Sequence, residues 1–462
     1  MKLTSNNYLF SNFNGEFLSE SISKNSLSIN NIYNLTTQNN TIEPVCDFSD
    51  LIENCFGLEF ANIIKTKYLD LFNSINNFYI YDYYDESSNL VKTRYFIINN
   101  NFNILEIDYE NLNIIDFNFK FNTKPSFLLL NEKLYIYALN NLFLMINKDN
   151  YPIALTDVLN ITSINDFDKY TIFTCFENKF SVYYTDKTEL LNLEHNLGIY
   201  NEIKLSPENG EIERIFIYKN NIYAVQKYAI SKIIIQNSEI SISNLCSIKS
   251  SIIFNSIELI DDYIIFLTTS GLFIFDGNDI KQVFKKETLN LIKSNVKSVS
   301  YNNKYYLMCN YFINHIKETL ILEFDIENNN CIFYKIESLL DISLLQTYST
   351  YKLVAITNEN NINKVKFLDL NKITTYKKYV RFNKLTFDDK PVKVLNELKI
   401  ISSGKFFVTI SSEIQTSTFE INGISYIRNI GIKGQTFEIE IQSDSSFKIE
   451  SIYIKTTSYS EE

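Results

Sequence analysis

Short apolar runs separated by two-residue polar breaks recur along the middle of this chain. Successive breaks lie 37 to 51 residues apart, at Asn131-Glu132, Asp168-Lys169, Lys219-Asn220, Asp261-Asp262, Asn302-Asn303 and Ser349-Thr350. A repeat of this length, built from short strands, is typical of the blades of a β-propeller. The clearest unit, residues 256–284, contains four apolar runs and three tight turns within 29 residues.

The remaining units have the same pattern less cleanly. A first, irregular unit begins at Phe78, and clearer ones cover about 124–157, 161–195, 212–246, 255–285, 296–337 and 343–376. We therefore expect an all-β fold with a six- or seven-bladed β-propeller over residues 76–380. Two or three β-sandwiches would also contain strands at similar spacing. The longer period, repeated without a helical interruption, favours the propeller.

The two ends of the chain differ from the middle. Residues 385–460 alternate between apolar and polar side chains and hold four of the ten glycines, which predicts a C-terminal antiparallel β-sandwich. Residues 1–75 form a third region, an N-terminal arm followed by short helices. Helical spacing of apolar residues occurs in 47–56 and 58–72, and Ser49 or Asp50 is available as an N-cap.

Composition restricts the classes of partner. The net charge is −11 without any run of Lys or Arg, so the chain lacks the basic footprint of a nucleic-acid-binding surface. The six cysteines are irregularly spaced and form no CxxC pair, which favours buried thiols in a reducing compartment over disulfides. No segment is apolar enough to span a membrane, and the first residues do not resemble a signal peptide.

Catalytic and metal-binding signatures are scarce. The two histidines, His195 and His315, have no second His or Cys at ligand spacing, and no nucleophile elbow, P-loop, dinucleotide fingerprint or zinc-protease motif is present. The acidic pairs Asp261-Asp262 and Asp388-Asp389 are explained by the preference of Asp for turns. We therefore expect no catalytic residue, no cofactor and no metal site, and a protein that is not an enzyme.

Two groups of segments carry a family resemblance. Residues 270–283, 298–307 and 320–327 resemble the blades of propeller proteins in bacteriophage tails, and residues 427–441 and 447–454 are similar to their C-terminal strands. The family is that of the tail hub, or packaged-DNA stabilisation, proteins of short-tailed phages. The resemblance covers about residues 250–460.

This resemblance implies a virion structural protein of the tail or neck, assembled in the host cytoplasm. Such a head-to-tail connector would form a ring of six or twelve copies that extends the portal channel and helps to retain DNA. Its partners would be itself, the portal or adaptor and other tail proteins, with genome DNA only as transient cargo. Residues 1–45 would then be an arm that is ordered only against a neighbouring subunit or the portal.

Two alternatives use the same blades. One is a receptor- or carbohydrate-binding propeller tail protein, or a cellular interaction scaffold, that binds through loops such as Asn310–Thr319 with His315. The other is a propeller glycosidase with two carboxylates about 5 to 10 Å apart at the mouth of the channel. The sequence nominates no such pair, so the glycosidase ranks last.

Overall fold

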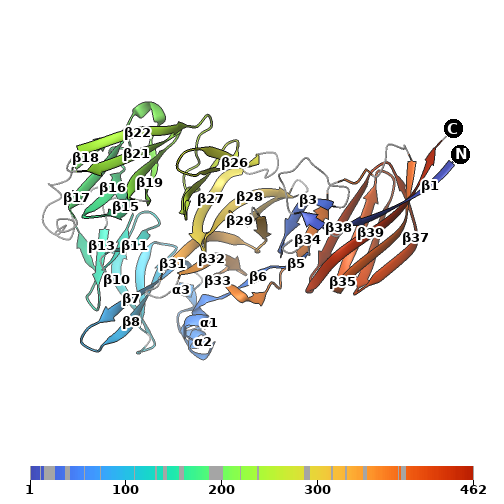
Figure 1. Cartoon of the computed structure of the whole chain (residues 1–462). Coiled ribbons are helices and arrows are strands. Elements are labelled where there is room, and N and C mark those ends of the chain that lie inside the picture. The colour runs from blue at the N-terminus through green and yellow to red at the C-terminus, as the bar shows by residue number, and fades with distance from the viewer. Residues whose placement is uncertain are drawn as a thin grey trace.

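Seven four-stranded antiparallel sheets and one larger sheet make up the described part of the computed structural model (Figure 1). The structure describes residues 2–460 except 11, 15–25, 37–41, 57, 73, 109, 131–132, 139–142, 156–160, 187–200, 219, 237–238, 286–291, 314–315, 328–329, 347–350, 383 and 387–391. The seven sheets are the blades of a β-propeller, which confirms the all-β fold class and fixes the blade number at seven.

The first four blades follow one another along the chain from the innermost to the outermost strand. Blade 1 contains β7 (Ile75–Asp85), β8 (Leu90–Asn99), β9 (Asn103–Asp108) and β10 (Asn113–Lys120). Blade 2 contains β11 (Ser126–Leu130), β12 (Lys133–Tyr137), β13 (Phe143–Asn147) and β14 (Ile153–Leu155). Blade 3 contains β15 (Ile161–Phe167), β16 (Tyr170–Cys175), β17 (Ser181–Asp186) and β18 (Asn201–Lys204), and blade 4 contains β19 (Ile212–Tyr218), β20 (Asn221–Gln226), β21 (Ala229–Gln236) and β22 (Glu239–Ser247).

Blades 5 and 6 continue this order, whereas blade 7 does not. Blade 5 contains β23 (Glu258–Ile260), β24 (Tyr263–Thr268), β25 (Gly271–Phe275) and β26 (Ile280–Lys285). Blade 6 contains β27 (Ile292–Tyr301), β28 (Lys304–Ile313), β29 (Ile316–Asp325) and β30 (Asn330–Tyr334). Blade 7 takes β31 (Leu339–Gln346), β32 (Tyr351–Glu359) and β33 (Ile362–Ile373) from this part of the chain and β6 (Cys46–Asp50) from the N-terminal region.

The predicted breaks lie between the first and second strands of blades 2 to 7. In blade 5, for example, β23 ends at Ile260 and β24 begins at Tyr263. Positive φ angles of 51° at Asp168, 48° at Asp261 and 49° at Asn302 explain the residue types, since Asn and Asp tolerate left-handed backbone better than other side chains. The interpretation of the repeat as a blade is confirmed.

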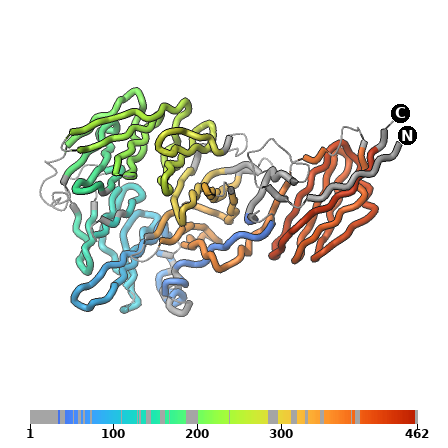
Figure 2. Tube along the Cα trace, in the orientation of Figure 1, coloured from blue at the N-terminus to red at the C-terminus, as the bar shows by residue number. Residues whose placement is uncertain are grey.

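Strand β6 closes the ring. It pairs antiparallel with β33, with Phe48 opposite Leu368, and so supplies the outer strand that the last blade lacks. Figure 2 shows this blue segment running from the side of the larger sheet along the propeller to the helices. The sequence predicted a helix from residue 47, but residues 47–50 belong to β6.

Three short helices follow β6 and lead into blade 1. They are α1 (Leu51–Phe56), α2 (Leu58–Lys67) and α3 (Leu69–Phe72). The backbone N–H of Glu53 donates to Asp50 Oδ1 at 2.9 Å, so Asp50 is the N-cap that the sequence offered. Leu51 and Ala61 are fully buried in a cluster with side chains of blades 1, 2 and 7. No helix among the described residues has the length and apolar character needed to cross a bilayer.

The larger sheet is folded into a sandwich around one long strand, β35 (Val392–Ser412). The first half of β35 lies between β39 (Phe447–Ser460) and β37 (Ser425–Gly434), and its second half lies between β38 (Phe437–Ser443) and β36 (Thr416–Asn422). The strand bends between the two halves at Gly404, which has a φ angle of 81°. Strand β34 (Lys378–Phe382) pairs with β38, so the sandwich includes residues before 385.

The N-terminal strands also belong to the sandwich. Strand β1 (Lys2–Phe10) pairs with β39 over its whole length, and β3 (Ser26–Tyr33) pairs with β34 and with β2 (Asn12–Asn14). Residues 2–10 therefore find a pairing partner within their own chain, where the sequence suggested a second subunit. A short hairpin of β4 (Leu35–Thr36) and β5 (Glu43–Pro44) then crosses to the propeller.

Candidate functional site

The inner strands of all seven blades line one open cavity along the axis of the propeller. Its volume is about 920 Å³, and it receives residues from β7, β11, β15, β19, β23, β27 and β31. A concave site of this size is within the range that binds small ligands. We refer to it as the channel.

Irregular strand pairing changes the direction of side chains near the start of four inner strands. In four blades the pairing with the second strand skips one residue near the start of the inner strand, and the skipped residues are Asn76, Thr162, Glu213 and Leu340. All four line the channel. A bulge bends its strand and turns side chains away from the regular alternation, as is common at the rims of closed sheets.

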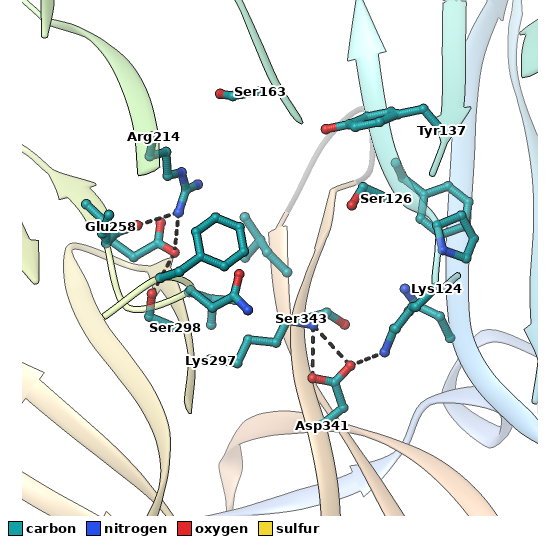
Figure 3. Close-up of a pocket in the computed structure, with 18 of the residues that line it drawn as sticks. Lys124, Ser126, Tyr137, Ser163, Arg214, Glu258, Lys297, Ser298, Asp341 and Ser343 are labelled. Carbon is teal, nitrogen blue, oxygen red and sulfur yellow. Dashed lines mark hydrogen bonds and ion pairs between the residues drawn. The ribbon is translucent and has the colours of Figure 1, made fainter. Parts of the chain in front are cut away.

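Two lysines share one carboxylate on one side of the channel (Figure 3). Lys297 Nζ lies 2.9 Å from Asp341 Oδ1 and 3.0 Å from Oδ2, and Lys124 Nζ also contacts Oδ2. The two ammonium groups come from β27 and from the residues before β11, and the carboxylate comes from β31. The side chains of both lysines are 32% exposed, whereas that of Asp341 is 14% exposed. This cluster therefore carries one excess positive charge.

Burial and charge act together in the lysine cluster. Burial lowers the pKa of Lys124, and the neighbouring positive charge of Lys297 lowers it further. Burial would raise the pKa of Asp341, but the charges and hydrogen bonds of Lys297 and Lys124 outweigh it and keep that pKa below its ordinary value. The carboxylate is thus held ionised between two partners.

An arginine–glutamate pair lies next to the lysine cluster, since the Ser298 that bonds to Glu258 directly follows Lys297 in β27 (Figure 3). Arg214 Nη1 is 2.9 Å from Glu258 Oε1 and also donates to the carbonyl of Ile257. Ser298 Oγ donates to the same Glu258 oxygen at 2.9 Å. The Glu258 side chain is only 8% exposed, so these two donors stabilise a carboxylate that has little contact with water.

The rest of the lining contains neutral polar and apolar side chains in similar numbers, together with the carboxyl group of Glu213. Hydroxyl and amide side chains include Ser126, Tyr137, Thr162, Ser163, Asn165, Ser300 and Ser343. Two large apolar side chains in the lining are unusually exposed, Phe254 at 56% and Leu340 at 50%. The channel can therefore offer hydrogen bonds, ammonium groups and an apolar contact to one ligand.

The residues singled out in the sequence do not meet in this channel. His195, His315, Asp388 and Asp389 lie outside the described residues. Asp261 and Asp262 are exposed in the turn between β23 and β24. The segment Asn310–Thr319, interpreted from the sequence as a long loop, belongs instead to the long hairpin of β28 and β29. Among the described residues there is no group of three or more His, Cys, Asp or Glu side chains placed to hold a metal ion.

The sequence does contain a signal for the channel residues. Five residues before each of the first five breaks stands a polar residue: Ser126, Ser163, Arg214, Ser256 and Lys297. Four of these five line the channel, and the fifth, Ser256, is buried. Aligning the units on their breaks would have placed Arg214 and Lys297 at equivalent positions of two blades.

Comparison with known proteins gives limited results. No protein-family model matches the chain, and no curated protein matches it. Solved structures that match include Hsv2 of Kluyveromyces lactis, with 10% identity and a TM-score of 0.33 over 53% of this chain and 82% of that chain. A K. lactis Hsv2 with loop 6CD replaced by a Gly-Ser linker matches with 9% identity and a TM-score of 0.33, over 53% of this chain and 81% of that one.

These comparisons correct the resemblance to the tail hub proteins of short-tailed phages. The matching structures named above are of a yeast protein, and no phage family model matches the chain. The segments that carried the resemblance are strands and turns of blades 5 and 6 and of the sandwich, so they reflect architecture that many propellers share. At this identity and TM-score, the likeness to Hsv2 carries no argument about function.

Proposed function

We propose that this protein is a non-enzymatic binding scaffold that receives a ligand in the mouth of its channel. The observation that carries the proposal is the 920 Å³ cavity, in which charged and hydroxyl side chains from separate blades converge. The blades supply a rigid frame, and their inner strands hold the binding groups at fixed positions.

The state of the carboxylates supports binding over catalysis. Glu258 and Asp341 are each engaged by cationic side chains. A glycosidase needs one carboxyl group that stays protonated beside a second one that is ionised. The pKa of Asp341 is lowered, which is the opposite of what a general acid requires, whereas burial raises the pKa of Glu213, the third carboxyl group of the lining. Asp341 and Glu258 are both held in ion pairs, so neither is free to act as the ionised partner of Glu213.

The proposal is tested by blocking the channel. Ser163 faces the opening in Figure 3, and Ser163→Trp would fill the mouth with an indole ring. The matched control is Ser241→Trp, on the exposed outer strand β22 of blade 4. The wild-type protein is screened by thermal shift and ligand-observed NMR against saccharides, organic acids and short peptides.

The expected result is a ligand whose binding is lost in Ser163→Trp and kept in Ser241→Trp. A ligand bound equally by both variants would place the binding surface elsewhere and overturn the proposal. Turnover of any bound compound would also overturn it.

A further inference from the structure

The lysine cluster leaves hydrogen-bonding capacity directed at the channel. Each ammonium group has three N–H donors. Lys124 contacts one oxygen of Asp341, and Lys297 contacts both. About a third of each lysine side chain is exposed. A second anion can therefore reach both nitrogen atoms without displacing Asp341.

Energetics also favour a second anion at this position. Two ammonium groups that share one carboxylate repel each other in a partly buried site, where charge interactions are stronger than in water. A second negative charge would neutralise the excess and replace water with charge-assisted hydrogen bonds. The lowered pKa of Lys124, caused by burial and by Lys297, reports the same repulsion.

Geometry indicates the kind of anion. Asp341 Oδ2 contacts both lysines and Oδ1 contacts Lys297, so the two nitrogen atoms lie close enough together to bind one carboxylate group. Away from this cluster, the lining offers neutral donors and acceptors, among them Ser126, Ser163 and Asn165. Phe254, whose aromatic ring is about half exposed, also lines the channel.

On the basis of the proposed function, we infer that the ligand is a hydroxylated carboxylic acid of the size of an acidic sugar residue. Its carboxylate lies between Lys124 and Lys297, its hydroxyl groups bond to the serine and asparagine side chains, and its C–H face contacts Phe254. A neutral sugar of the same shape lacks the group that the lysines recognise.

The test uses the full-length protein and isothermal titration with galacturonate, with galactose and galactose 6-phosphate as comparison probes. Lys297→Met removes one ammonium group at nearly constant side-chain length, and we expect it to weaken galacturonate binding about tenfold or more. Asp341→Asn removes the competing carboxylate but keeps the oxygen that accepts from the backbone N–H of Ile342. That variant is expected to bind galacturonate more tightly than the wild type.

The control variant is Lys364→Met. Lys364 is also a lysine in an ion pair, 2.6 Å from Glu359 Oε2, but it does not line the channel. Its galacturonate affinity is expected to equal that of the wild type. The opposite signs of Lys297→Met and Asp341→Asn separate recognition from damage to the fold, because a misfolded variant would lose affinity in both cases.

Three outcomes overturn the inference. Equal affinities for galactose and galacturonate would show that the lysines do not recognise the carboxylate. A higher affinity for galactose 6-phosphate would show that the site binds phosphate. Absence of galacturonate binding in both the wild type and Asp341→Asn rejects the ligand class. In that last case, the proposed function as a binding scaffold would still hold if another ligand bound to the wild type and to Ser241→Trp but not to Ser163→Trp.

Discussion

The side-chain amide of Asn34 pairs with the backbone of Lys335, 301 residues away, as a neighbouring strand would. Asn34 Oδ1 accepts from the N–H of Lys335 at 2.8 Å, and Asn34 Nδ2 donates to the carbonyl of Lys335 at 3.2 Å. The same Nδ2 donates to the carbonyl of Lys377 at 2.8 Å, just before the sandwich strand β34. One buried side chain thus joins the end of blade 6 to the start of the sandwich.

Replacing Asn34 should loosen this junction. Asn34→Ala leaves three backbone groups without their partner and forces Ala into a φ of 58°, so we expect a loss of about 2 to 4 kcal/mol in the free energy of unfolding. Chemical denaturation measures it. The matched control is Asn360→Ala, an exposed turn residue with a φ of 54°, which should cost only the backbone term of about 1 kcal/mol. Equal losses in the two variants would show that the junction contributes nothing.

Gly404 allows β35 to pass from one sheet of the sandwich to the other. A Cβ atom there would lie 2.3 Å from the carbonyl oxygen of Ser446 and 2.9 Å from the Cα of Phe447. Because backbone atoms cannot move away cheaply, Gly404→Ala should destabilise the protein by about 3 kcal/mol or more. Gly423→Ala is the control, since it has a φ of 68° but no neighbour within 4 Å, and should cost about 1 to 2 kcal/mol. Thermal unfolding that ranks the two variants in the reverse order would contradict this account of the bend.

Removing one partner of the Arg214–Glu258 ion pair should destabilise the protein more than removing both. Arg214→Met leaves the carboxylate of Glu258, 8% exposed, with Ser298 as its remaining donor in the channel, and should destabilise by about 3 kcal/mol. The double variant Arg214→Met/Glu258→Leu should recover most of that loss, because no buried charge is left unpaired. Denaturant midpoints of the wild type, both single variants and the double variant complete the cycle. Additive losses would mean that the two side chains act independently.

Glu213 makes the stability of the protein depend on pH. Burial, together with the negative charge of Glu211, raises the pKa of Glu213 above its ordinary value of 4.5, and Lys227 and Lys179 only partly offset the shift. The native state therefore binds more protons than the unfolded state above pH 4.5, and stability falls as the pH rises through the native pKa.

Glu213→Gln should consequently raise the melting temperature at pH 7 and leave it unchanged below pH 4.5. The control is Glu239→Gln on the exposed outer strand β22. A stabilisation that persists at acid pH would assign the effect to packing instead of charge.

The sequence predicted the parts of the fold that depend on neighbouring residues. The breaks located the first hairpins of blades 2 to 7, because hairpin turns are specified by two to four residues. The N-cap was narrowed to Ser49 or Asp50 for the same reason, since capping depends only on residues within one turn, and the structure shows that it is Asp50.

The sequence pattern could not predict the pairing of strands that lie far apart in the chain. Strand β6 has only five residues, and the helical spacing that begins at Asp47 obscured it. Its partner β33 lies more than 300 residues later, so nothing local indicates that the two meet. The channel was missed for a related reason: Lys124, Lys297 and Asp341 come from three blades, and only ring closure brings them together.

The pairing of β1 with β39 fixes an order of events during synthesis. Lys2–Phe10 is synthesised long before its partner Phe447–Ser460, and β6 likewise has to await β33. The propeller ring can therefore close only after β33 has been made, and the outer edge of the sandwich only after β39 has been made. Until then the strand edges that these partners cover are unpaired and accessible to other chains, a condition that favours aggregation.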